Sequence, residues 1–156
     1  NQFITKNIFG KPVDTFAEFF IHASINDEKV GQYEDTIFHV DRYLPCLKII
    51  YSPNKILDTD APFGFIKKSH KLNKKYMRDF LLNTTNVYLK DENLENNILN
   101  DEIKASCMDN SLIIAFTNGF HKRNIFLKKN YLRKTVFFQF TKKFNRFSLF
   151  NYNKYN

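Results

Sequence analysis

Several residue types that organise other small proteins are scarce in this chain of 156 residues. It has only two cysteines, Cys46 and Cys107, which excludes a disulfide framework and a four-thiolate zinc site and favours a reducing, cytoplasmic setting. Glycine and proline occur four times each, so we expect loops built from Asn, Asp and Lys, without a flexible linker. No apolar run is long enough to predict a membrane-spanning helix, and no signal-peptide pattern opens the chain.

Acidic residues are absent from 110–156, which carries ten basic groups, whereas 1–109 is close to neutral. Such asymmetry can indicate an anionic partner such as a nucleic acid. Arginine, however, accounts for only five of the 24 basic residues, and proteins that read nucleic acids often depend on its bidentate contacts. Asn, Lys, Phe, Ile and Tyr, which share AT-rich codons, make up half of the chain. We therefore interpret the lysine excess as compositional and do not favour a nucleic-acid partner.

Short apolar runs separated by turn residues follow Gly31 and are typical of β-strands. The strands that we predict are 36–41, 47–51, 63–66, 111–116, 120–127 and 135–141. Helical spacing predicts helices at 15–23, where Thr15 and Glu18 form a capping box, and at 73–83. The polar segment 91–104 is predicted to be a loop with a helical turn. This pattern indicates a mainly-β barrel or sandwich, formed as a single domain over 1–156.

A histidine and an aspartate lie two residues apart on the first of these predicted strands. Alternation along a strand sends His39 and Asp41 to one face, with Phe38 and Val40 on the other. One imidazole and one carboxylate do not complete a metal site, and the chain has only four histidines. His121 is the best third ligand, because it follows the Asn118-Gly119 turn where a strand is expected to begin. Two histidines and one carboxylate on one face of an iron ion leave positions open for oxygen chemistry.

A basic residue opens the last strong strand and supports this interpretation. Arg133 and Thr135 share a face of the predicted strand with Phe137 and Gln139. An arginine held on a strand and directed into a barrel is suited to a carboxylate, to which a threonine hydroxyl can also donate. A buried arginine without a partner would be costly, so an inward Arg133 requires an anion.

In this order, the motifs resemble those of the phytanoyl-CoA dioxygenase family of Fe(II)/2-oxoglutarate oxygenases. The resemblance covers roughly 32–142 and rests on His39-x-Asp41, Ala61-Pro62-Phe63, Ser69-His70-Lys71, Asp109-Asn110-Ser111-Leu112, His121 and Arg133. It implies a double-stranded β-helix, also called a jelly roll, with a few short flanking helices. Only 38 residues precede His39 in this sequence, fewer than family members usually have before their first ligand. Part of the family's N-terminal helical region is therefore expected to be reduced or absent.

The resemblance also implies roles for individual residues. His39, Asp41 and His121 would bind Fe(II), and Arg133 would hold the distal carboxylate of 2-oxoglutarate, with Thr135 and, on weaker grounds, Thr36 near this cosubstrate. O₂ and a small or carrier-linked organic substrate, with an anionic one as an option, would be the other partners. A carboxylate ligand at position 41 favours hydroxylation over halogenation. His70 is interpreted as a loop residue rather than a ligand.

The chain departs from the usual family pattern at three places. Asp60-Ala61-Pro62 stands where Asn-Gly-Pro is usual, and Lys67-Lys68-Ser69-His70 stands where Pro-Gly-Ser-His is usual. Arg123 occupies a position that is commonly small. Three other interpretations therefore stay open: a barrel of the same fold that has lost turnover, a basic module that binds polyanions, and a cupin-like metal enzyme that does not use 2-oxoglutarate.

Overall fold

The computed structural model describes residues 13–24, 34–41, 46–71, 100–128 and 130–142. These residues form a mainly-β structure in which every strand pairing is antiparallel, with one short 3₁₀ helix, η2 (Glu34–Thr36). The mainly-β prediction is therefore confirmed. The predicted helix at 73–83 lies outside the described residues. Among the described residues, no helix is long and apolar enough to span a membrane.

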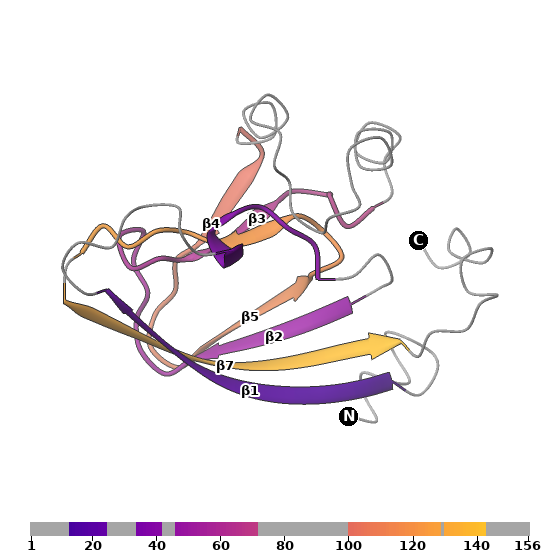
Figure 1. Cartoon of the computed structure of the whole chain (residues 1–156), viewed down its shortest axis with the longest axis horizontal. Helices are drawn as coiled ribbons and strands as arrows, with labels where there is room; N and C mark the ends of the chain where they lie inside the picture. The colour runs from indigo at the N-terminus through magenta and orange to yellow at the C-terminus, as the bar shows by residue number, and fades with distance from the viewer. Residues whose placement is uncertain (1–12, 25–33, 42–45, 72–99, 129, 143–156) are drawn as a thin grey trace.

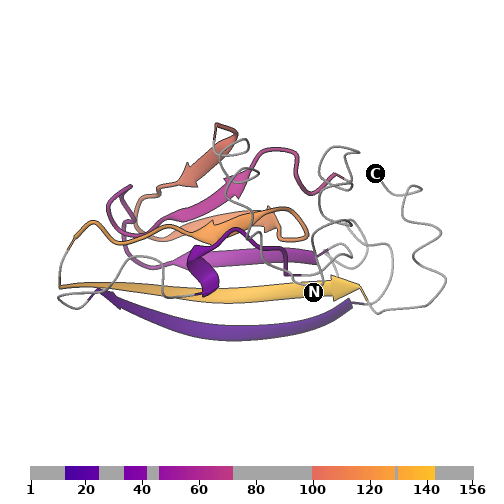
Figure 2. The same cartoon turned by 45° about the horizontal axis from the view of Figure 1, so that its top comes forward.

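The strands form two sheets. One has the order β1-β7-β2-β5 and the other β4-β3-β6. Figures 1 and 2 show the smaller sheet lying over the larger one, in which β1 and β7 are long, curved neighbouring strands. The strand bounds are β1 (Val13–Ser24), β2 (Cys46–Ser52), β3 (Phe63–Ile66), β4 (Glu102–Ala105), β5 (Ser111–Phe116), β6 (His121–Arg123) and β7 (Tyr131–Lys142).

The helix predicted at 15–23 is wrong. Residues Val13–Ser24 instead form β1, which pairs with Tyr131–Lys142 of β7 along its whole length. Phenylalanine spacing in this segment fits a helix, but aromatic residues also favour strands, and a twelve-residue ladder outweighs local helical propensity. The prediction of a loop at 91–104 is also wrong over its last residues, which enter β4.

The strands predicted at 63–66 and 111–116 are confirmed with their boundaries, and those at 47–51 and 135–141 lie within longer strands. The strand predicted at 120–127 is reduced to β6 and an isolated bridge at Phe126. The strand predicted at 36–41 is wrong as a regular element, because it begins in η2 and forms only an isolated bridge at His39. Its alternation survives, since Phe38 and Val40 are buried.

The turn after β3 contains a lysine in an unfavourable backbone conformation. Lys68 has a φ of 62° and an exposed side chain. The left-handed conformation costs a residue with a Cβ about 1–2 kcal/mol, whereas glycine adopts it freely but loses more chain entropy on folding. We expect Lys68→Gly to raise the free energy of unfolding by about 0.5–1 kcal/mol, measured by urea denaturation. Lys67→Gly, where φ is not positive, should instead lower it. If both variants lowered the free energy of unfolding equally, this explanation would be contradicted.

Candidate metal centre

Two of the predicted metal ligands are joined through their backbones. His39 and His121 form an isolated antiparallel bridge, in which each amide donates to the other residue's carbonyl at 2.9 Å. Directly paired residues on antiparallel strands place their side chains on the same side. The two imidazole rings consequently lie 4.4 Å apart between centroids. Asp41 joins them because its amide donates to the carbonyl of Thr117 at 2.9 Å, which continues the alternation of this segment.

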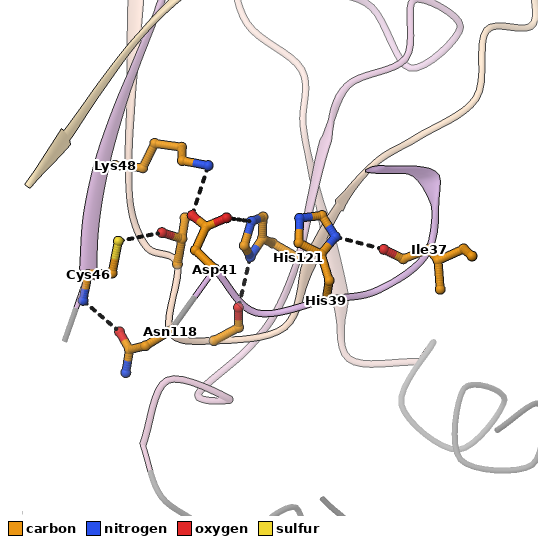
Figure 3. Close-up of polar contacts among 9 residues, drawn as sticks. Ile37, His39, Asp41, Cys46, Lys48, Asn118 and His121 are labelled. Carbon is orange, nitrogen blue, oxygen red and sulfur yellow. Dashed lines mark hydrogen bonds and ion pairs between the residues drawn. The ribbon is translucent and has the colours of Figure 1, made fainter. Parts of the chain in front are cut away.

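The three side chains converge. One potential ligand atom from each of His39, Asp41 and His121 lies within 4.8 Å of the other two. His121 Nε2 is buried without a hydrogen bond and lies 3.5 Å from Asp41 Oδ1. Figure 3 shows both imidazoles and the carboxylate gathered at one point. The sequence therefore placed these three residues together correctly, although the strand assumed for two of them does not form.

The backbone orients both imidazoles. His39 Nδ1 lies 2.8 Å from the carbonyl of Ile37, and His121 Nδ1 lies 2.9 Å from the carbonyl of Gly119. A carbonyl can only accept, so each Nδ1 carries a proton, and in a neutral ring the lone pair then lies on Nε2. This is the arrangement that metal-binding histidines need. Burial, followed by the neighbouring His121, lowers the pKa of His39 to about 4, so this ring is neutral at pH 7.

Asp41 is charged. Burial alone would raise its pKa, but the neighbouring His121 and the ammonium group of Lys48 outweigh burial and hold the pKa below the usual range. Lys48 Nζ lies 2.8 Å from Asp41 Oδ2. The cluster thus combines one neutral imidazole whose ring is already oriented, a second oriented imidazole and one carboxylate. This donor set suits a divalent first-row metal.

The turn that carries His121 is fixed by the segment after β3. Ser69 Oγ donates to the carbonyl of Ile66 and accepts from the amide of Phe120, both at 2.8 Å. Gly119 approaches this segment so closely that a Cβ would lie 2.8 Å from both the amide nitrogen of His70 and Ser69 Oγ. His70 itself stacks on Phe116 and is not part of the metal cluster, as the sequence interpretation expected.

A cavity of about 270 Å³ lies between the two sheets beside the metal cluster. Side chains from β2, β3, β6, β7 and the 34–41 segment line it. Its charged lining residues besides the cluster are Lys48, Lys122, Arg123, Arg133 and Asp35. Cations therefore outnumber carboxylates on the cavity wall, and such a cavity suits an anionic ligand.

Arg133 lies in this wall as predicted. Its side chain is 3% exposed, and its Nε is buried without a hydrogen bond. Burial, followed by the positive charge of Arg123, lowers the pKa of Arg133 to about 10, so it stays charged at pH 7. A buried guanidinium with an unsatisfied donor is costly unless an anion completes it.

The two threonines assigned to the cosubstrate are placed less directly. Thr135 lies on the same face of β7 as Arg133 and is fully buried, with an Oγ1 that lacks a hydrogen bond, but it does not line the cavity. Thr36 ends η2 and does not line the cavity either.

Three lining residues were missed or only partly anticipated from the sequence. Arg123 donates to Asp35 from Nε at 2.7 Å and from Nη2 at 3.1 Å, which ties β6 to η2. Period-two spacing from His121 would have placed Arg123 on the same side. Lys48 lies on β2, and its side chain reaches the cluster. Asp35 gave no signal in the sequence, because its position depends on a 3₁₀ turn.

No protein-family model and no curated protein matches the chain. Solved structures do resemble it. AviO1 from Streptomyces viridochromogenes Tue57 matches 90% of this chain and 56% of its own, with 9% identity and a TM-score of 0.54. Apo HygX from Streptomyces hygroscopicus matches 85% of this chain and 59% of its own, with 11% identity and a TM-score of 0.50. These matches show a shared fold, and this chain spans little more than half of either protein.

HygX has also been solved with iron bound and with nickel and 2-oxoglutarate bound. The latter structure matches 83% of this chain with 14% identity and a TM-score of 0.42.

Proposed function

We propose that this chain is an Fe(II)- and 2-oxoglutarate-dependent oxygenase that hydroxylates a C–H bond of a small organic molecule. One observation carries the proposal: a His-Asp-His cluster opens onto a cavity whose wall contains a buried arginine with an unsatisfied donor. We propose a double-stranded β-helix of the phytanoyl-CoA dioxygenase type, with 1–156 as one domain. The shared fold with apo HygX, a protein that binds iron, supports this assignment.

His39, Asp41 and His121 are the proposed iron ligands. The unsatisfied, buried Nε2 of His121 and the orientation of the His39 ring support a metal site here. Three protein ligands leave coordination positions for a chelating cosubstrate and O₂. Iron with 2-oxoglutarate supplies the oxidising chemistry, with release of succinate and CO₂. The chain's own residues hold and orient the ligands.

Arg133 is the proposed clamp for the distal carboxylate of 2-oxoglutarate. Its side chain lies in the cavity wall on β7, and an anion there would satisfy the buried Nε. Thr135, two residues further along the same face, has a hydroxyl that would contribute a second donor. Thr36 is retained in this proposal as a residue near the cosubstrate. The surplus of cations on the wall also favours an anionic substrate.

The decisive experiment is an anaerobic titration of the protein with Fe(II) and 2-oxoglutarate. We expect a weak visible charge-transfer band that appears only when both are present, because the band requires the cosubstrate to chelate iron in the site. Fe(II) alone and 2-oxoglutarate alone are the controls. A folded protein that binds iron without forming the band would favour a cupin-like metal site. A protein that binds neither, but binds DNA with a steep salt dependence, would refute the oxygenase assignment.

A further inference from the structure

A lysine contacts the metal cluster from a neighbouring strand. Lys48 lies in β2, where it pairs with Gln139 of β7 and Ala115 of β5. Its side chain is 12% exposed, and its ammonium group lies 5.3 Å from the centre of the Phe137 ring. Lysine is rarely buried to this extent without a partner that compensates for lost hydration. The partner is Asp41, as Figure 3 shows.

The two oxygens of Asp41 have different surroundings. Oδ2 lies 2.8 Å from Lys48 Nζ, whereas Oδ1 lies 3.5 Å from His121 Nε2. Oδ1 is therefore the oxygen that lies beside the candidate ligand His121, whereas Oδ2 contacts the ammonium group. A carboxylate can bind a metal through one oxygen or through both, and binding through both would fill one more coordination position. An ammonium group on Oδ2 competes with that second contact.

We infer that Lys48 is a positioning residue that restricts Asp41 to one oxygen in metal binding and so keeps a position open for the cosubstrate. This inference rests on the proposed function. The ammonium group of Lys48 lowers the affinity of the site for metal, because a cation beside the carboxylate repels a second cation. In return, the metal keeps enough coordination positions for 2-oxoglutarate to bind through two atoms beside the three protein ligands. Neither the cluster motif nor the arginine clamp contains this residue.

Lys48→Met tests the inference, since methionine keeps the apolar stem without the charge or the donor. We expect Fe(II) to bind about tenfold more tightly, by anaerobic calorimetry, because charge repulsion is removed. In the iron-loaded variant, we expect 2-oxoglutarate to bind about tenfold more weakly. A crystal structure of Lys48→Met with Mn(II) should show both oxygens of Asp41 on the metal. Lys48→Arg, which retains a cationic donor, should restore 2-oxoglutarate binding.

Lys122→Met is the matched control, because Lys122 lines the same cavity but packs over Phe38 and lies 4.0 Å from Glu102. Its effect on iron affinity should be clearly smaller. The opposite changes in the two affinities are the signature of positioning. A parallel loss of both affinities, or a loss of 2-oxoglutarate binding alone, would overturn the inference. If Lys48→Met fails to fold, the same opposite changes in Lys48→Gln decide. A wild-type protein that binds no iron would instead refute the proposed function.

Discussion

His39→Ala is expected to abolish the charge-transfer band of the iron and 2-oxoglutarate complex. The variant removes one of the three proposed ligands of the cluster. Loss of residues that merely support a metal ligand costs about 10–100-fold in metal affinity, so loss of a ligand should cost at least about 100-fold. The fold should persist, because His39 is held to His121 through backbone hydrogen bonds that alanine retains. Calorimetry with Fe(II) and the visible spectrum measure both effects.

His70→Ala is the control for this variant. It also removes a partly buried histidine, but one that stacks on Phe116 outside the cluster. The hydrogen bond that Asn118 Nδ2 donates to this residue uses the backbone carbonyl of His70, which the variant keeps. We expect His70→Ala to retain the charge-transfer band, although the protein should be slightly less stable. A band of normal strength in His39→Ala would show that iron binds elsewhere.

Arg133→Met is expected to weaken 2-oxoglutarate binding to the iron-loaded protein by about 100-fold. A charge-assisted, bidentate contact to a carboxylate is worth roughly 1.5–3 kcal/mol, which corresponds to a factor of about ten to more than one hundred. Iron affinity should change much less, since Arg133 is not one of the three ligands. Calorimetric titration with each ligand separates the two effects.

The same variant should make the protein without ligands more stable. Arg133 is buried with an unsatisfied Nε, and a buried charge without a partner is costly, so an apolar side chain of similar length should raise the free energy of unfolding. Thermal unfolding measures this. Lys134→Met is the matched control, because its exposed side chain lies on the opposite face of β7. The proposed role of Arg133 as a carboxylate clamp would be refuted if Arg133→Met and Lys134→Met had the same effect on 2-oxoglutarate affinity and on stability.

Local patterns in the sequence were sufficient to predict the direction of a side chain where that direction depends on strand alternation alone. Arg133 and Thr135 are buried on one face of β7, and the exposed side chain of Phe138 lies on the other, as period two requires. His39 and Asp41 point the same way although their segment is not a regular strand, because a bridge and one further backbone hydrogen bond impose the same alternation.

The features that the sequence did not predict depend on pairing between distant segments, which local spacing does not encode. The helical spacing of 15–23 gave a wrong prediction because β7 offers that segment a full-length partner. Lys48 reaches Asp41 only because β2 lies between β7 and β5 in the sheet. Asp35 meets Arg123 because η2 turns beside β6. Such register and sheet order are tertiary properties, and they decide which charges meet.

The bridge between His39 and His121 also has a consequence for the order of folding. The two residues belong to distant parts of the chain, because β2, β3, β4 and β5 all lie between them in the sequence. Closing so long a loop costs entropy before any contact compensates for it, so we expect these ligands to meet late in folding. Iron would then act as a mass-action stabiliser of the finished fold and would not serve as a nucleus for its formation.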